Sequence, residues 1–67
     1  MINLETFKVT GKNLVRLLKK NGWILDRIQG SHHVMKKDSK TETVPMHGNK
    51  DLPIGLVDAI MKRTGLK

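Results

Sequence analysis

The chain has 67 residues, 37% of them hydrophobic and 3% aromatic, which suffices for one small domain with a thin core. The absence of cysteine excludes disulfides and thiolate metal sites. No apolar run approaches the roughly 18 residues that a membrane span needs, and the N-terminus lacks the layout of a signal peptide. We therefore expect a cytoplasmic protein. Because its core is thin, we also expect limited stability and a partner or an oligomer that adds to it.

Charge is the most informative part of the composition. Thirteen Lys and Arg against six Asp and Glu give a net charge of +7 at pH 7. The basic residues extend from Lys8 to Lys67, so the positive field belongs to the folded body and not to a disordered arm. Such an excess indicates a polyanionic partner, with nucleic acid first and an acidic protein second. The alternative is a surface that is basic only for solubility.

The chain shows no internal repeat, low-complexity tract or linker, which predicts a single domain over residues 1–67. Residues 1–10 have no clear period and are expected to form an N-terminal extension. Within them, Thr6–Val9 could form an added edge strand.

The first firm element is a helix at about 11–21. Thr10 can cap it by accepting hydrogen bonds from the freed N–H groups of the first turn, and Asn21-Gly22 supplies a left-handed stop. Its apolar stripe consists of residues spaced i, i+3 and i+4: Leu14, Leu17 and Leu18. Most of its basic residues fall outside that stripe.

Three short segments rich in β-formers follow and predict an antiparallel sheet; they are residues 23–29, 32–37 and 41–46, separated by polar turns. Pro45 cannot donate to a ladder, so the third strand should be at an edge or ending there. Val34 and Val44 are predicted to face the helices, with Met35 as the competing choice.

A loop over 47–51 leads to Pro53, which suits the first turn of a second helix. Apolar residues then recur at helical spacing, namely Ile54, Val57, Ile60 and Met61, and Gly65 ends the element. The predicted fold class is α+β, with a three-stranded antiparallel sheet and two helices covering one face.

Histidines are the main candidates for chemistry. Adjacent His32 and His33 point to opposite faces of a strand, so they are unlikely partners for one ion, and no clustered carboxylates complete a metal site with His47. His33 is read as a structural or surface residue. His32 begins a strand after a tight turn on a basic chain, where an imidazole can exchange a proton near neutral pH.

RNA carries its own nucleophile, the 2′-hydroxyl, so a ribonuclease needs no metal in principle. It needs a base for that hydroxyl, for which His32 is the candidate, and a cation for the developing phosphorane charge. The cation could come from Lys36, Lys37 or Lys50, and His47 or a water could protonate the leaving 5′-oxygen. From the residues alone, a structural role for the histidine remains the commoner outcome.

Several short runs occur in the order typical of one family: Asn21-Gly22-Trp23, Gly30-Ser31-His32-His33, Val44-Pro45-Met46-His47 and Asp51-Leu52-Pro53-Ile54-Gly55. Because of these runs, the chain resembles the HicA (YcfA-like) toxins of toxin–antitoxin pairs over about residues 11–66. The resemblance implies an α-β-β-β-α fold like that of double-stranded-RNA-binding domains. It also implies a ribonuclease that cuts mRNA and arrests translation as part of a stress response.

The same resemblance assigns the catalytic role to His32, because the family histidine follows the glycine-rich turn. Ser31 and His47 stand at positions of the family pattern, and we take them as candidate RNA contacts together with the three lysines named above. It implies no cofactor. It also implies an antitoxin of the HicB type that masks the active site and through which the complex binds promoter DNA.

Two other readings remain open. The chain could be a non-catalytic module that binds double-stranded RNA through the same basic surface. A weaker reading is a small basic subunit that binds only an acidic protein.

Overall fold

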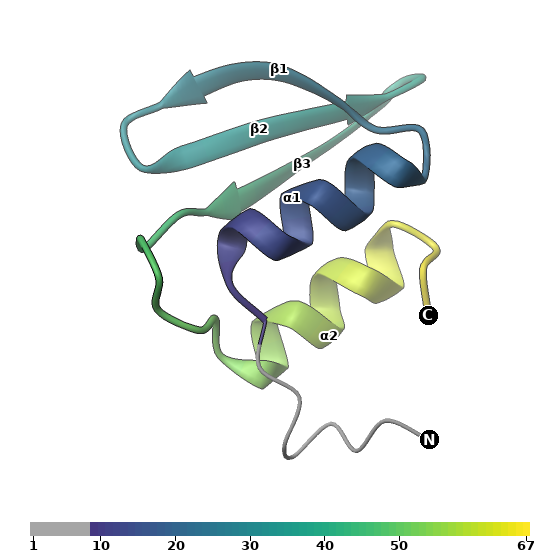
Figure 1. Ribbon diagram of the computed structural model, residues 1–67. Helices are drawn as coiled ribbons and strands as arrows, with labels where there is room; N and C mark the ends of the chain where they lie inside the picture. The colour runs from purple at the N-terminus through teal and green to yellow at the C-terminus, as the bar shows by residue number, and fades with distance from the viewer. Residues whose placement is uncertain (1–8) are drawn as a thin grey trace.

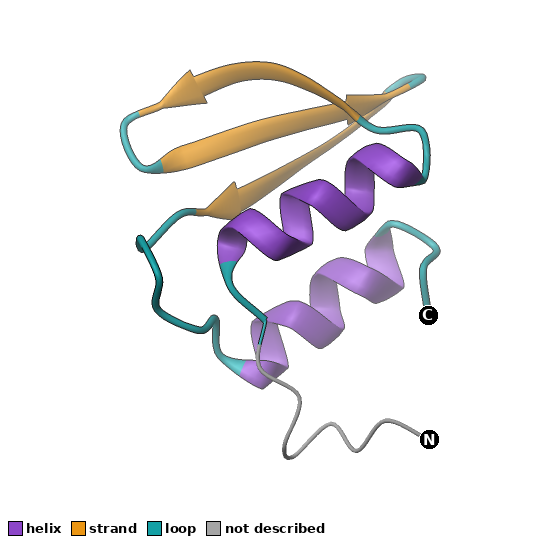
Figure 2. Cartoon of the chain, in the orientation of Figure 1, coloured by secondary structure: helices purple, strands orange, loops and turns teal. Residues whose placement is uncertain are grey.

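A computed structural model of the protein describes residues 9–67 (Figure 1). The elements follow one another as α1 (Gly11–Lys20), β1 (Ile24–Gln29), β2 (His32–Lys37), β3 (Lys40–Pro45) and α2 (Ile54–Arg63). The sheet forms one layer, and both helices lie side by side beneath the same face of it (Figures 1 and 2). The predicted α+β architecture is therefore confirmed, and each predicted element lies within about three residues of its expected bounds.

Helix α1 begins and ends as its sequence predicts. The Thr10 hydroxyl accepts a hydrogen bond from the Asn13 amide at 3.1 Å, and Gly22 adopts a φ of +92° just beyond the last turn. The buried side consists of Gly11, Leu14, Val15 and Leu18. Leu17, which the spacing places in the apolar stripe, is instead 37% exposed, because the helix contacts the sheet through a narrower face.

The sheet has the order β1-β2-β3, with both pairs antiparallel and an irregularity in β1 between Leu25 and Arg27. Val44 lies opposite His33 and therefore shares its face, whereas Val34 lies opposite Thr43 on the other face. The prediction that Val34 and Val44 both face the helices is thus wrong for Val34. That side chain is only 3% exposed but lies on the outer face, and Met35 takes the helix-facing position.

The core lies between this inner face and the two helices. It comprises Leu14, Val15, Leu18, Trp23, Met35, Val44, Leu52, Val57 and Ile60. Trp23 is buried in this core at 3% exposure, whereas Ile54, which was predicted to be in the second apolar stripe, is 50% exposed at the start of α2. The N-terminus of α1 approaches the end of β3 so closely that a Cβ on Gly11 would lie 2.4 Å from the Pro45 carbonyl oxygen.

Residues just before α1 also belong to the folded body. The Val9 carbonyl accepts a hydrogen bond from the Leu52 amide at 2.7 Å, and Thr10 forms an isolated bridge with Asp51. The rest of the proposed edge strand Thr6–Val9 lies outside the described residues. Neither helix in the described part of the chain is long and apolar enough to cross a membrane.

Candidate active site

His32 and His33 stand next to each other at the start of β2 and project from opposite faces of the sheet. His32 lies opposite Gln29 and Pro45 on the outer face and is exposed. His33 lies opposite Ile28 and Val44 on the face that α1 and α2 cover, and its side chain is partly buried. The two imidazoles therefore meet different surroundings.

A hollow of about 270 Å³ lies between α1 and the inner face of the sheet; we call it the His33 hollow. It is lined by Lys12, Val15, Arg16, Lys19, Leu25, His33 and Met46. On the edge strand β1, Leu25 in this lining and the nearby Ile28 are 36% and 56% exposed. Every charged residue in the lining is a cation, so the hollow attracts anions.

The cations of the His33 hollow all come from α1. Lys12, Arg16 and Lys19 are spaced i, i+4 and i+7, which puts them on one side of the helix. At 1.5 Å per residue the row is about 10 Å long. A row of this kind can contact neighbouring phosphates of one nucleic-acid strand, with the guanidinium suited to two-pronged phosphate contacts.

The imidazole of His33 has an unmet hydrogen-bonding position. Its Nδ1 atom is buried and has no hydrogen-bond partner within residues 9–67. Trp23 Nε1 is also unpartnered, but Trp23 belongs to the core, whereas His33 lines an open hollow. Buried polar atoms are usually satisfied, so the unpartnered Nδ1 atom sets His33 apart from a histidine whose hydrogen bonds are all made within the core.

The predicted RNA contacts are divided between the two ends of the sheet. The Met46 amide donates to the Ser31 carbonyl at 2.7 Å, so Ser31, His32 and the loop that carries His47 share one end. Lys50 lies in that same loop, where its amide donates to the His47 carbonyl at 3.1 Å. The structure thus brings these four predicted residues to one end of the molecule.

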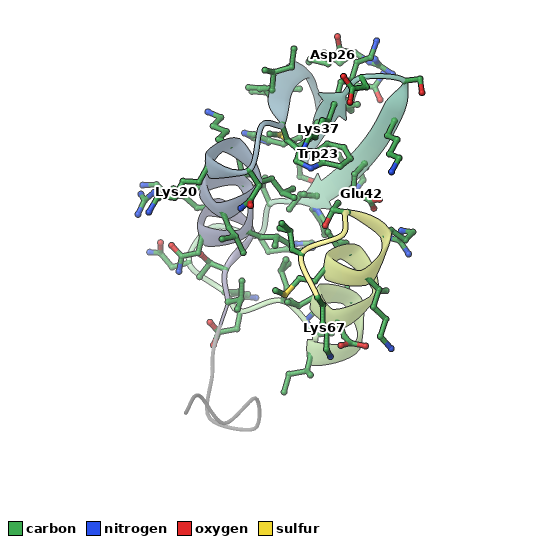
Figure 3. All side chains as sticks on the ribbon, turned by 90° about the vertical axis from the view of Figure 1, so that its right-hand side faces the viewer. Lys20, Trp23, Asp26, Lys37, Glu42 and Lys67 are labelled. Carbon is green, nitrogen blue, oxygen red and sulfur yellow. The ribbon has the colours of Figure 1, made fainter. Side chains whose placement is uncertain are left out.

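Lys36 and Lys37 lie at the other end of β2, four and five residues from His32, which is about 13–16 Å along a strand. The Lys37 ammonium donates to the Asn21 carbonyl at 2.7 Å and so ties β2 to the end of α1 (Figure 3). Neither lysine lies in the lining of the His33 hollow.

The α1 cations are not singled out in the sequence analysis, where His33 is read as a structural or surface residue. A signal for both was present. If Met35 faces the helices, strand alternation puts His33 on the same face, directed toward a helix whose charged residues are all basic. Among the residues that the structure describes, no group of three or more His, Asp or Glu side chains is arranged to hold a metal ion.

Comparison of the sequence with known proteins identifies the family of this chain. The sequence model of the family described as HicA toxin of bacterial toxin–antitoxin matches residues 11–66, which is nearly the whole chain. The chain therefore belongs to the HicA toxin family, as its sequence resemblance suggested, and its class is that of the toxin in a toxin–antitoxin pair. No curated protein matches the sequence.

Proposed function

We propose that the protein is a metal-independent endoribonuclease that cuts mRNA, arrests translation and is neutralised by a HicB-type antitoxin. The observation that supports this most directly is the His33 hollow. Its lining contains the His33 imidazole together with three cations and apolar side chains. A general base next to positive charge is what cleavage of RNA by its own 2′-hydroxyl requires.

In the proposed reaction, the imidazole takes the proton of a ribose 2′-hydroxyl as that oxygen attacks the adjacent phosphorus. A new O2′–P bond forms and the P–O5′ bond breaks. Lysine and arginine side chains stabilise the negative charge that builds on the phosphorane oxygens. A proton goes to the departing 5′-oxygen. It comes from His47, which lies exposed in the loop that follows β3, or from a water.

The choice between the two imidazoles follows from their surroundings. The family resemblance assigns the base to His32, and that assignment stays a prediction. The geometry favours His33, because the lining that contains this residue also contains Lys12, Arg16 and Lys19. His32 lies on the outer face and is not in the lining of that hollow.

The proposed partners follow from charge. A domain of net charge +7 attracts RNA phosphates and an acidic antitoxin surface alike. We expect contact with promoter DNA only indirectly, through the antitoxin. The three cations that line the hollow are exposed, so an antitoxin that covers them would block RNA at the same time.

The activity is tested by incubating the purified protein with RNA and resolving the products on a denaturing gel. We expect cleavage that persists in EDTA and stops when the cut-site ribose is replaced by 2′-deoxyribose. Loss of cleavage in EDTA would point to a metal, and continued cutting of the deoxy substrate would exclude the 2′-hydroxyl as nucleophile. RNA that is bound but left intact would favour the non-catalytic RNA-binding module.

A further inference from the structure

A second hollow lies between the two helices, and the proposed reaction does not use it. We call it the α1–α2 groove; its volume is about 340 Å³. Its lining is mainly apolar and consists of Val9, Leu14, Leu17, Val57 and Met61, with Asn13, Arg16 and Lys20 as its polar members. Arg16 is the one residue that it has in common with the His33 hollow.

The apolar lining of this groove is partly open to solvent, mainly at Leu17. Leu17 is 37% exposed although the sequence pattern of α1 is that of a core-facing leucine, and Met61 and Val9 are partly buried. An exposed apolar surface with a polar border is typical of a protein-binding site. RNA is a poor fit for it, because none of the lining residues is an aromatic on which a base could stack.

The charge at the groove is of one sign. Arg16 and Lys20 are one helical turn apart on α1, and the lining contains no Asp or Glu. Helix α1 has no acidic residue along its whole length. A partner that buries apolar side chains here would therefore also place carboxylates beside these two cations, since complementary charge steers association and disfavours other partners.

We propose that the α1–α2 groove is the docking site for an acidic amphipathic helix of the protein partner. The apolar side chains of that helix lie against Leu17 and Met61, and its flanking carboxylates pair with Arg16 and Lys20. This is the binding mode in which an amphipathic helix lies in a groove and is anchored at i, i+3, i+4 and i+7. The inference rests on the proposed function only in taking this partner to be the antitoxin.

The test uses the full chain and a labelled synthetic helical peptide with leucines at i, i+3, i+4 and i+7 and glutamates at the flanking positions. A peptide of the same composition with scattered leucines is the control. Binding is measured by fluorescence anisotropy. We expect the amphipathic peptide to bind and the scattered one to bind at least about tenfold more weakly, because it cannot bury its leucines on one side. Equal binding of both peptides would overturn the proposal.

Variants then locate the binding site. Leu17→Asp and Lys20→Glu should each weaken peptide binding by about tenfold or more. Ile54→Asp and Lys40→Glu are the matched controls, because Ile54 is 50% exposed and neither residue lines the groove. Leu17→Ala, which introduces no charge into α1, should give a smaller loss in the same direction. Equal binding by Leu17→Asp and the parent, or equal loss in Ile54→Asp, would contradict the assignment.

The other occupant to test is the chain's own segment of residues 1–8. If that segment fills the groove instead of a partner helix, the parent should bind the amphipathic peptide no better than the scattered one, and Phe7→Asp should lower the Tm; these two results together would overturn the proposal. RNA cleavage by the same variants separates the two hypotheses. A parent that binds the peptide but cuts no RNA contradicts the proposed function alone. A parent that cuts RNA but does not bind the peptide contradicts this inference alone.

Discussion

Glu42 and Arg63 form a two-pronged ion pair that joins β3 to the last turn of α2. Arg63 Nη2 lies 2.7 Å from Glu42 Oε1, and Arg63 Nε lies 3.1 Å from Glu42 Oε2. The Glu42 side chain is almost buried on the helix-facing side of the sheet (Figure 3). These hydrogen bonds first, and the carboxylate charge second, raise the pKa of Arg63.

Loss of this ion pair should loosen α2. We expect Arg63→Ala to lower the Tm, because it leaves an almost buried carboxylate without its only guanidinium partner in residues 9–67. The matched control is Lys62→Ala, which removes an exposed i, i+4 contact with Asp58 at 3.1 Å and should change the Tm little. Equal Tm values for the two variants, measured by thermal unfolding, would show that the pair does not hold α2 in place.

The pH dependence of the pair follows from the direction of the pKa shift. A cation whose pKa is raised in the folded state contributes stability that is fully present below the unfolded pKa and disappears as pH rises through the folded pKa. For an arginine this window lies at extreme alkaline pH. The Tm difference between the parent and Arg63→Ala should therefore stay constant between about pH 7 and pH 10. A difference that shrinks over this range would mean that another group controls it.

Replacement of glycine by alanine should have opposite effects on stability at Gly11 and at Gly55. A Cβ on Gly11 would lie 2.4 Å from the Pro45 carbonyl oxygen and 2.8 Å from Met46 Sδ, so Gly11→Ala must move α1 away from β3. We expect a loss of about 1–3 kcal/mol in the free energy of unfolding. Gly55 in α2 has nothing within 4 Å, so Gly55→Ala should gain about 0.5 kcal/mol. Urea titration measures both, and a neutral Gly11→Ala would contradict the close approach.

The α1 cations should control the salt dependence of RNA binding. If Lys12, Arg16 and Lys19 each contact a phosphate, each single alanine variant should weaken binding and reduce the slope of log K against log salt by about 0.7. Lys40→Ala is the control, because it makes the same change of charge outside the His33 hollow. Anisotropy titrations of a single-stranded RNA at several salt concentrations give the slopes. Equal slopes for all four variants would place the RNA elsewhere.

Most of the fold could be predicted because local signals agree with one another. The Thr10 cap, the glycine after α1, the polar turns and Pro53 each mark an element end that the structure confirms. It was harder to predict which side chains of β2 point toward the helices. Its sequence offers Val34 and Met35 as neighbouring apolar residues, and alternation alone cannot decide between them. The outcome depends on which side chain fits against α1, which is a property of packing.

The candidate site was less predictable than the fold for the same reason. In a strand, His32 shares a face with Val34, and His33 shares the other face with Met35. Predicting that Val34 faces the helices therefore puts His32, and not His33, on the helix-facing side. In the sequence the α1 cations only fall outside the apolar stripe of the helix, and it is the structure that places three of them with His33 in the lining of one hollow. The end-of-sheet grouping of Ser31, His32 and His47 likewise depends on how the loop after β3 meets the β1–β2 turn.

The most direct test of the account is RNA cleavage by His33→Ala beside His32→Ala, with far-UV circular dichroism to verify that both variants fold. If the imidazole in the His33 hollow is the general base, His33→Ala should lose at least about 10²-fold in rate. His32→Ala should cut at nearly the parental rate. A parental rate for His33→Ala with loss of cleavage in His32→Ala would move the chemistry to the outer face of the sheet and contradict the account.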